Sequence, residues 1–381
     1  MLFVQSSQIA EGMCVAEDVH DQSGRILIAR GQRIGPSHLV RLQKFGIQSL
    51  FIDGGSGARP AEPPKTDLRK QCETVFRAVY AEAKSGGTTV RSRHSESIAA
   101  ASSELVRSLR LGDCRVVTLS GSSEERDLEP QHAVNSAALA VAIGIDQKLS
   151  SDALRELGSA MLLHDIGFAL LPRTSTEGTA QPTPDQIQQF RAHTLLGYNY
   201  VLRTELLHAG AAEILLSHHE RMNGSGYPRA LSGEKLSVSM RIAAVADTFD
   251  ALTSRNRFGL PPALPDAALE WMQSRYGLYD NGIAAALGHR VIWYPDGVSV
   301  RLTTGEIGTV AGTLPHASSR PVVLIHSDSK GRVLPEPIIV DLMTETGRSV
   351  ARSAPTLERL HEMRSAASPG DTIDPTLFDL I

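Results

Sequence analysis

A set of ionisable residues inside apolar, helix-like segments constrains the fold of this chain more than any other feature. Five of its 13 histidines fall in such segments together with two aspartates, and the residues are His132, His164, Asp165, His193, His218, His219 and Asp247. Burying a charged or unpaired polar group costs free energy unless the group is hydrogen-bonded, paired or bound to a metal. We therefore expect several helices to converge so that these side chains hold cations together.

Each of these residues has an ordinary explanation when it is taken alone. A single histidine on a helix is more often a hydrogen-bonded core residue than a metal ligand, and Asp247 could pair with Arg241. These explanations do not account for the combination, in which a His-Asp pair, a histidine on each neighbouring helix, a His-His pair and a later aspartate occur together. The combination favours a metal site.

A helical pattern of apolar residues runs from about residue 66 to residue 290. It predicts helices over 66–84, 94–110, 132–144, 152–165, 184–202, 211–222 and 237–254. Thr183, Pro184 and Gln186 predict the start of one helix, since they fit an N-cap, a proline at the first helical position and a capping-box partner. The helix that carries the His-His pair is expected to end at Asn223 and Gly224, which tolerate the left-handed conformation of a C-cap.

The segments on either side of the helical region have different patterns. Residues 1–53 predict a small α+β accessory domain, with a hairpin in 15–34, a helix in 36–47 and a strand in 48–53, and the Gly- and Pro-rich stretch 54–65 predicts a linker. The helical domain is placed at 66–290, with its core motifs in 125–260. Residues 291–345 predict a small β-rich domain, barrel or sandwich, and 346–381 predict a polar tail with a short helix at 355–365. The expected fold class is mainly α, with these two small domains attached.

The composition excludes several classes of protein. The 381 residues are 41% hydrophobic, carry a formal net charge of −4 and contain no block of Lys and Arg, so neither a nucleic-acid duplex nor a membrane surface is an expected partner. The longest apolar runs are too short to span a bilayer, and the first residues lack the pattern of a signal peptide. Three widely spaced cysteines fit no disulfide framework. These features predict a cytoplasmic protein.

The stretch HHERMNGSGYP (218–228) predicts a loop that binds substrate above the histidines. Gly224 and Gly226 would let backbone N–H groups approach an anion without obstruction by side chains. Tyr227 offers a ring face for a guanine or a hydroxyl for a phosphate, and Arg221 offers a cation. Without the His-His pair, an ordinary helix-terminating loop would be the better interpretation.

The motifs LLHDIG (162–167), HHER (218–221), GSGYP (224–228) and VADTFDALTS (245–254), together with His132 and His193, resemble the HD-GYP family of HD phosphohydrolases over residues 125–290. The resemblance implies an all-α bundle with metals at its centre, and hydrolysis of the bacterial messenger cyclic di-GMP by a hydroxide held between two metals. It implies that Asp165 is the catalytic residue that bridges both metals, that His132, His164 and Asp247 complete one site, and that His193, His218 and His219 complete the other. Such donors suit two divalent metal ions. We expect iron or manganese, and nickel and zinc are also compatible with these donors.

Several positions depart from the family pattern. Phe168 stands where most members have a phosphate-contacting lysine, and Asn256 and Gly259 stand where they have an arginine and a further base. Each charge-assisted contact to phosphate contributes about 1.5–3 kcal/mol, so these replacements predict weaker substrate binding. Leu128 stands where members with a third metal have a glutamate, and we therefore expect two metals.

Three functions remain open from the sequence. The first is a metal-dependent cyclic di-GMP phosphodiesterase whose activity is reduced by the missing cations. The second is a catalytically weak or inactive signalling module that binds a nucleotide or a partner protein. The third is a phosphohydrolase for another nucleotide. The sequence also leaves a homo-oligomer open.

Overall fold

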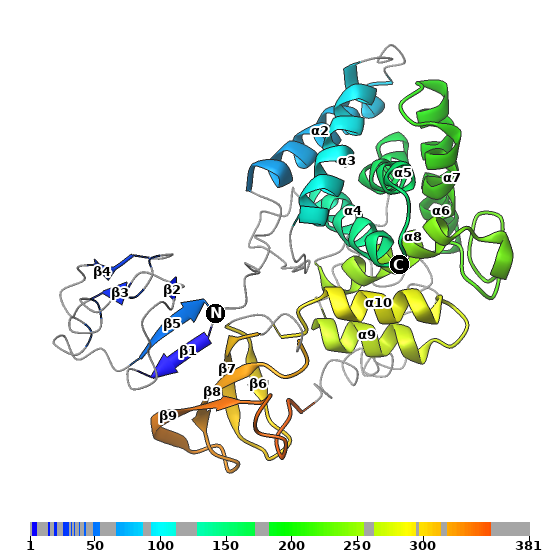
Figure 1. Ribbon diagram of the computed structural model, residues 1–381. Helices are drawn as coiled ribbons and strands as arrows, with labels where there is room; N and C mark the ends of the chain where they lie inside the picture. Colours follow the sequence, from blue (N-terminus) through cyan, green and yellow to red (C-terminus); the bar gives the residue numbers. More distant parts are fainter. Residues whose placement is uncertain are drawn as a thin grey trace. The chain divides into compact units, whose positions relative to one another are not determined.

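The structure is a computed structural model that describes residues 66–86, 93–111, 128–171, 183–254, 263–294, 297–313 and 318–351, with short strands and single residues inside 2–53. The described residues fall into two compact units, one formed by 66–293 and the other by residues of 2–53 together with 294–351. The first unit is helical and the second is built of strands (Figure 1). Asn256, Gly259, the expected linker 54–65 and the expected helix at 355–365 lie outside the described residues.

The helical unit confirms the mainly α fold class. Its elements are α2 (Thr66–Lys84), α3 (Arg93–Leu111), α4 (Leu128–Asp146), α5 (Ser151–Leu162), the 3₁₀ helix η3 (Ile166–Leu170), α6 (Pro184–Arg203), α7 (Ala209–Ser217), the 3₁₀ helix η4 (Gly233–Lys235), α8 (Val238–Thr253), α9 (Pro265–Ser274) and α10 (Asn281–Arg290). The sequence pattern gives no separate prediction for α9 and α10, which have ten residues each.

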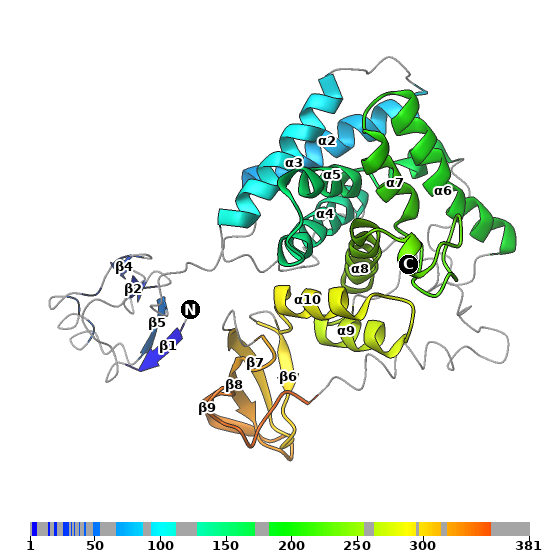
Figure 2. The ribbon, with the colours of Figure 1, turned by 45° about the vertical axis from the view of Figure 1, so that its right-hand side comes forward.

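Helix α4 is the central element of this unit. It packs against α2, α3, α5, α8 and α10, and Figure 2 shows its neighbours around it. Every residue from Ala133 to Gly144 is buried, and many of them are alanines. A helix that is apolar on all sides is stable only when other helices cover it, and small side chains let those helices approach closely. His132 lies just before this buried stretch, so the packing of α4 fixes where its imidazole points.

Local capping explains where several helices begin. Thr183 Oγ1 accepts from the backbone N–H of Gln186, whose side chain accepts from the N–H of Thr183, so the predicted capping box at the start of α6 is confirmed. Ser237 caps α8 in the same way by accepting from the N–H of Met240.

The predicted end of the helix before the glycine-rich loop is wrong. Helix α7 ends at Ser217, with His218 as its C-cap, and does not continue to Asn223 and Gly224. Gly224 does adopt a left-handed conformation with φ of 81°, but in a turn six residues beyond the cap. The chain therefore leaves the helix at the His-His pair itself.

The second unit contains two groups of strands. Residues of the first 53 form β1 (Leu2–Gln5), β2 (Cys14–Val15), β3 (Val19–His20), β4 (Ile26–Ile28) and β5 (Ser49–Asp53), in a sheet of order β1-β5-β2 and a β3-β4 pair. The pair confirms the predicted hairpin, and β5 confirms the predicted strand. Only single residues of the predicted helix at 36–47 are described.

The strands after the helical unit form a four-stranded antiparallel sheet. It consists of β6 (Ser299–Arg301), β7 (Ile307–Gly312), β8 (Val322–Ser327) and β9 (Val333–Asp341), paired in sequence order. The alternating burial along β7 places every second side chain in the core, as expected for a half-buried strand. This sheet confirms a small β-rich part near the C-terminal end of the chain. Among the helices described in either unit, none has the length and apolarity that a bilayer span requires.

Candidate metal centre

The structure brings all seven predicted ligand residues together inside the helical unit. His132 comes from α4, His193 from α6 and Asp247 from α8, while His164 and Asp165 lie between α5 and η3, and His218 and His219 directly follow α7. Six of the seven are buried, and the His132 side chain keeps 19% of its surface exposed. Arg241, the alternative partner considered for Asp247, pairs with Asp280 instead.

Asp165 lies between two groups of histidines and turns one carboxylate oxygen toward each. Its Oδ2 is 3.9 Å from His132 Nε2 and 3.8 Å from His164 Nε2. Its Oδ1 is 3.4 Å from His193 Nε2 and 3.9 Å from His218 Nε2. A carboxylate with this arrangement can serve as a shared ligand for two cations, one on each side.

The ligand atoms on the two sides of Asp165 form separate clusters. His132, His164 and Asp247 form the first, in which Asp247 Oδ1 lies 2.9 Å from His132 Nε2 and 3.2 Å from His164 Nε2. His193, His218 and His219 form the second, in which Nε2 of His193 and Nε2 of His218 are 3.2 Å apart. In each cluster the ligand atoms all lie within 4.8 Å of one another, which is close enough for a single cation to contact them.

Hydrogen bonds on the outer side of the rings fix which nitrogen faces the centre. Nδ1–H of His164, His193 and His218 donates to the carbonyl oxygen three residues earlier, at distances of 2.7, 2.6 and 2.5 Å. Because a carbonyl can only accept, Nδ1 carries a proton in each ring and Nε2 is the nitrogen that faces the centre. Second-layer contacts of this kind orient metal-binding histidines in proteins generally.

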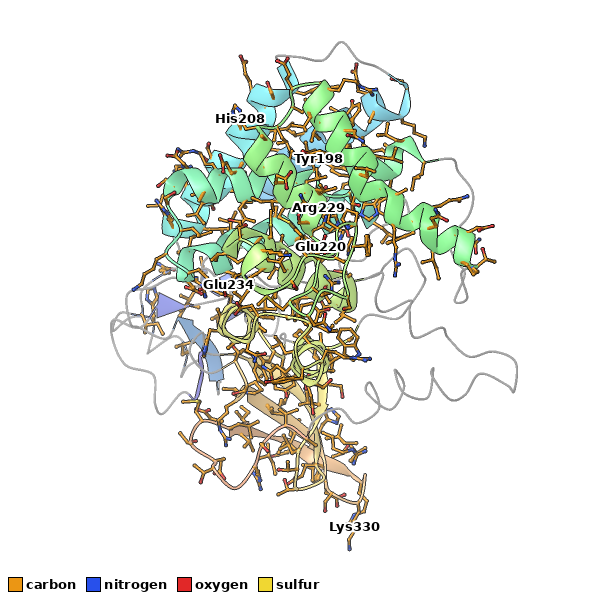
Figure 3. The ribbon with its side chains drawn as sticks, turned by 90° about the vertical axis from the view of Figure 1, so that its right-hand side faces the viewer. Tyr198, His208, Glu220, Arg229, Glu234 and Lys330 are labelled. Carbon is orange, nitrogen blue, oxygen red and sulfur yellow. The ribbon has the colours of Figure 1, made fainter. Side chains whose placement is uncertain are left out.

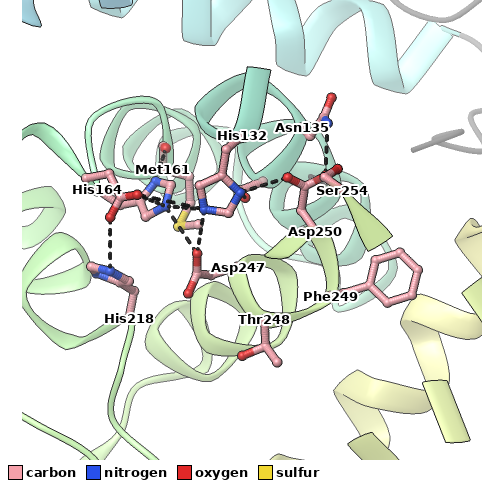
Figure 4. A network of polar contacts seen from close by, with 12 residues as sticks. His132, Asn135, Met161, His164, His218, Asp247, Thr248, Phe249, Asp250 and Ser254 are labelled. Carbon is pink, nitrogen blue, oxygen red and sulfur yellow. Dashed lines mark hydrogen bonds and ion pairs between the residues drawn. The ribbon is translucent and has the colours of Figure 1, made fainter. Parts of the chain in front are cut away.

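His132 is oriented by a carboxylate that the sequence analysis missed. Asp250 Oδ2 lies 2.7 Å from His132 Nδ1, and its other oxygen accepts from Asn135 Nδ2 and Ser254 Oγ, each at 2.9 Å (Figure 4). Asp250 follows Asp247 by three residues in the same apolar run, and therefore lies on the same face of α8. A second aspartate at that spacing is the signal that could have identified it.

The electrostatics of the centre fit divalent cations. His219 Nδ1 and Asp247 Oδ2 are buried 3.8 Å apart, and neither atom has a hydrogen-bond partner in the described part of the chain. Burial and the nearby charge of His164 lower the pKa of His218 to about 3, and burial holds the pKa of His219 well below its ordinary value. Burial alone would raise the pKa of Asp247, but hydrogen bonds from His132 and His164 hold it well below its usual range. The neutral imidazoles of His218 and His219 beside the ionised carboxylate of Asp247 suit a metal site, whose ligands must be deprotonated.

Two glycines allow the backbone contacts that build the centre. A Cβ on Gly167 would lie 1.9 Å from the carbonyl oxygen of His193, so only glycine lets η3 approach α6 this closely. A Cβ on Gly226 would lie 2.4 Å from the carbonyl oxygen of His219 and 2.5 Å from the backbone nitrogen of Arg221. The structure therefore gives Gly226 a packing role against the His-His turn.

Arg221 and Tyr227, the two side chains expected to contact the substrate, are both buried in the structure. Arg221 is buried, donates to the carbonyl oxygens of His218 and Glu220, and lies with its guanidinium carbon 5.2 Å from the centroid of the Tyr279 ring. It holds the turn and does not reach into open space. The Tyr227 ring is also buried, and it stacks on His219 with ring centroids 4.6 Å apart, so its face is not free for a guanine.

Glu220 holds the glycine-rich loop in place, and the sequence analysis missed this role. Its buried carboxylate accepts from the backbone N–H of Arg229 at 2.8 Å and of Leu231 at 2.9 Å. Arg229, which Figure 3 labels near Glu220, in turn donates to Ser217 Oγ and pairs with Glu213, each at 2.8 Å. The loop that carries Tyr227 is thereby fastened to the end of α7.

Phe168 occupies the edge of the second cluster. Its ring is stacked on the imidazole of His193, with centroids 4.1 Å apart and an angle of 13° between the planes, and it also contacts Phe190. An aromatic ring here orients and shields His193 but supplies no charge for a phosphate. Leu128 begins α4 and contributes no carboxylate to the centre.

Comparison with known proteins agrees with these motifs. A family model described as "HD domain" matches residues 117–283, and one described as "KOW domain associated with HD domain" matches residues 299–358. The chain is 31% identical over 213 residues to "Cyclic di-GMP phosphodiesterase PA4108" of Pseudomonas aeruginosa, which covers 55% of this chain and 51% of that protein. It is 36% identical over 167 residues to "Cyclic di-GMP phosphodiesterase" of Thermotoga maritima, which covers 43% of this chain and 45% of that protein.

Two further similarities complete the comparison. The chain is 33% identical over 104 residues to "3'3'-cGAMP-specific phosphodiesterase 2" of Vibrio cholerae, which covers 27% of this chain and 20% of that protein. Among solved structures, "Bd1817, a HDG"Y"P protein from Bdellovibrio bacteriovorus" matches with a TM-score of 0.46 and 15% identity, over 75% of this chain and 97% of that chain. The chain spans about half the length of the first two relatives. With Gly226-Tyr227-Pro228 packed against the His-His turn, the HD domain at residues 117–283 is of the HD-GYP type.

Proposed function

We propose that this protein is a phosphodiesterase that hydrolyses a cyclic dinucleotide, with cyclic di-GMP as its substrate, at a centre of two divalent cations. The observation that carries the proposal is the position of Asp165, whose two carboxylate oxygens face two separate histidine clusters. The similarity to two proteins named cyclic di-GMP phosphodiesterases supports the choice of substrate.

The residues around Asp165 have separate tasks in this proposal. Two divalent cations, when bound, would lower the pKa of an attacking water and stabilise the charge of the phosphoryl oxygens during in-line displacement. Asp165 sets the spacing of the two positions, and the Nδ1 hydrogen bonds of His164, His193 and His218 keep each Nε2 turned inward. Phe168 and Phe190 flank His193 and keep water from that side of the centre.

We propose iron or manganese as the cations, with nickel and zinc as alternatives. The donors are imidazole nitrogens and carboxylate oxygens with no thiolate among them, and such a set suits all four metals. We also propose that the domains at 1–53 and 291–345 are accessory to the chemistry, because the candidate ligands all lie in the helical unit.

The test is a product assay on the full chain loaded with manganese or iron. We expect conversion of cyclic di-GMP to the linear dinucleotide or GMP, and we expect Asp165→Asn to abolish it by removing a charge shared by both clusters. Asp152→Asn is the matched control, because the Asp152 side chain is 86% exposed at the start of α5. Metal-loaded protein that yields no product would contradict the proposal.

A specific observation favours a second candidate function. Phe168 supplies no cation at the position where it stacks on His193, so the chain could bind a nucleotide without turnover or act on a different one. Binding of cyclic di-GMP that is unchanged in Asp165→Ala, without any product, would support a binding module. Release of product from another nucleotide in a panel would support a phosphohydrolase of different specificity.

A further inference from the structure

Arg191 is a cation near the centre whose guanidinium has no hydrogen-bonding or ionic partner among the residues that the structure describes. It lies on α6 two residues before His193, and its Nε is buried without a hydrogen-bond partner. Its guanidinium carbon lies 5.1 Å from the centroid of the Tyr227 ring, and that ring stacks on His219. The Arg191 side chain therefore lies over Tyr227, whose ring is stacked on His219 of the second histidine cluster.

Other arginines around the centre are engaged in the fold. Arg221 donates to two backbone carbonyls of the His-His turn, Arg229 pairs with Glu213, and Arg241 pairs with Asp280. The structure shows no ion pair for Arg191 within the part of the chain that it describes. Among these four arginines, Arg191 is the one with no hydrogen-bond or ion-pair acceptor for its guanidinium among the described residues.

The unpartnered state of Arg191 needs a physical explanation. A buried N–H group without an acceptor costs free energy, and the contact with the Tyr227 ring does not satisfy Nε–H because a ring face is at best a weak acceptor. A planar guanidinium matches the oxygens of a phosphate and can bind two of them at once. Tyr227 Oη is also buried without a partner and lies in the same neighbourhood. An anion at this position would satisfy Nε–H of Arg191.

We propose that Arg191 binds a phosphate group of the substrate from the α6 side of the centre. This inference rests on the proposed function, since it takes the anion to be a phosphate of the hydrolysed nucleotide. Phe168 presents an uncharged ring to His193, whereas Arg191, two residues before His193 in α6, would supply a cation for the phosphate.

The experiment compares Arg191→Gln, Arg191→Lys and the wild-type chain, all loaded with manganese. Inorganic phosphate and cyclic di-GMP are titrated calorimetrically, and cyclic di-GMP hydrolysis is measured as separate kcat and KM values. We expect Arg191→Gln to weaken phosphate binding and to raise KM by about 10- to 100-fold, with a smaller effect on kcat. Arg191→Lys should retain part of the affinity, because it keeps the charge but not the planar pair of donors.

Arg203→Gln is the matched control. Arg203 lies in the last turn of the same helix and is exposed, so this variant removes an equal charge from α6 at a distance from the centre. Manganese content and the midpoint of urea unfolding are measured for every variant. Phosphate affinity and manganese content should both match the wild type in Arg203→Gln.

The outcomes separate this inference from the proposed activity. Phosphate affinity that is equal in Arg191→Gln and wild type, or absent in both, overturns the role of Arg191. Loss of manganese together with phosphate in Arg191→Gln also overturns it, since the residue would then support the fold and not the anion. A third result is that phosphate binding depends on Arg191 but the protein does not hydrolyse cyclic di-GMP. This result would support the anion site and contradict the proposed substrate.

Discussion

Asp250 Oδ2 lies 2.7 Å from Nδ1 of His132, the ring nitrogen that does not face Asp165. The two residues are 118 positions apart in the sequence, and the contact joins α4 to α8 at the first histidine cluster. The carboxylate raises the basicity of the ring and fixes its orientation, while Asn135 and Ser254 hold the carboxylate itself.

Asp250→Asn should therefore weaken metal binding without removing a ligand. An amide cannot stabilise the imidazole as a carboxylate does, and we expect manganese affinity to fall about 10- to 100-fold. Competition with a metal-sensitive dye measures the change, and the exposed Asp152→Asn serves again as the control. Unaltered affinity in Asp250→Asn would show that this hydrogen bond does not tune the centre.

Gly226→Ala should disrupt the turn that carries the His-His pair. The added Cβ would lie 2.4–2.5 Å from backbone atoms of residues 219–221, which cannot move as a flexible side chain could. We expect a loss of about 1–3 kcal/mol in the free energy of unfolding, measured with urea, together with weaker metal binding. Gly288→Ala, where the nearest atom is 3.8 Å from the added Cβ, should leave both quantities nearly unchanged. Equal stability of the two variants would contradict the packing role of Gly226.

The stability of the metal-free chain should be greatest near pH 6.5, the ordinary pKa of histidine. Burial, together with the charge of His164, lowers the pKa of His218 to about 3 in the folded chain. Below pH 6.5 the unfolded chain therefore takes up a proton at this residue that the folded chain does not, and the stability of the folded chain falls. His219, whose pKa burial also lowers, acts in the same direction.

His132 determines how the stability of the metal-free chain changes above pH 6.5. Burial opposes its charge, but the hydrogen bonds that His132 donates to the carboxylates of Asp247 and Asp250 outweigh burial and raise its pKa well above the ordinary value. The stability that it contributes is therefore fully present below pH 6.5 and is lost as the pH rises through the raised pKa. Urea unfolding in a chelator from pH 4 to pH 9 measures the profile, and His218→Gln should reduce the decline on the acid side. A profile without a maximum would argue against this charge arrangement.

Phe168→Lys should strengthen substrate binding if the aromatic ring is what limits it. A lysine at the edge of the second cluster adds a cation where the ring now stacks on His193, and one charge-assisted contact corresponds to a decrease of about tenfold or more in KM. Phe168→Leu removes the ring without adding charge and separates the two effects. If the KM of Phe168→Lys is no lower than that of Phe168→Leu, the missing cation at this position does not limit substrate binding.

The identity of the candidate ligands could be predicted from the sequence because it depends on residue type and local periodicity. Histidines and aspartates within apolar helical segments have few ways to be buried, and the structure gathers all seven of them. The capping box at Thr183 and Gln186 was equally predictable, since its hydrogen bonds join residues three positions apart. The end of α7 at Ser217 was not, because it depends on where the His-His pair must point.

The roles of the surrounding residues were decided by tertiary structure alone. Arg221 is adjacent to the His-His pair in sequence but turns back to the carbonyls of its own turn, whereas Arg191, on another helix, reaches Tyr227. Asp250 acquires its function from His132 only when α4 packs against α8. Sequence by itself determined which side chains needed a cation or a partner, because the cost of burial belongs to each residue type. The packing of distant helices decided which partner each one met, because a long side chain points wherever its neighbours leave it space.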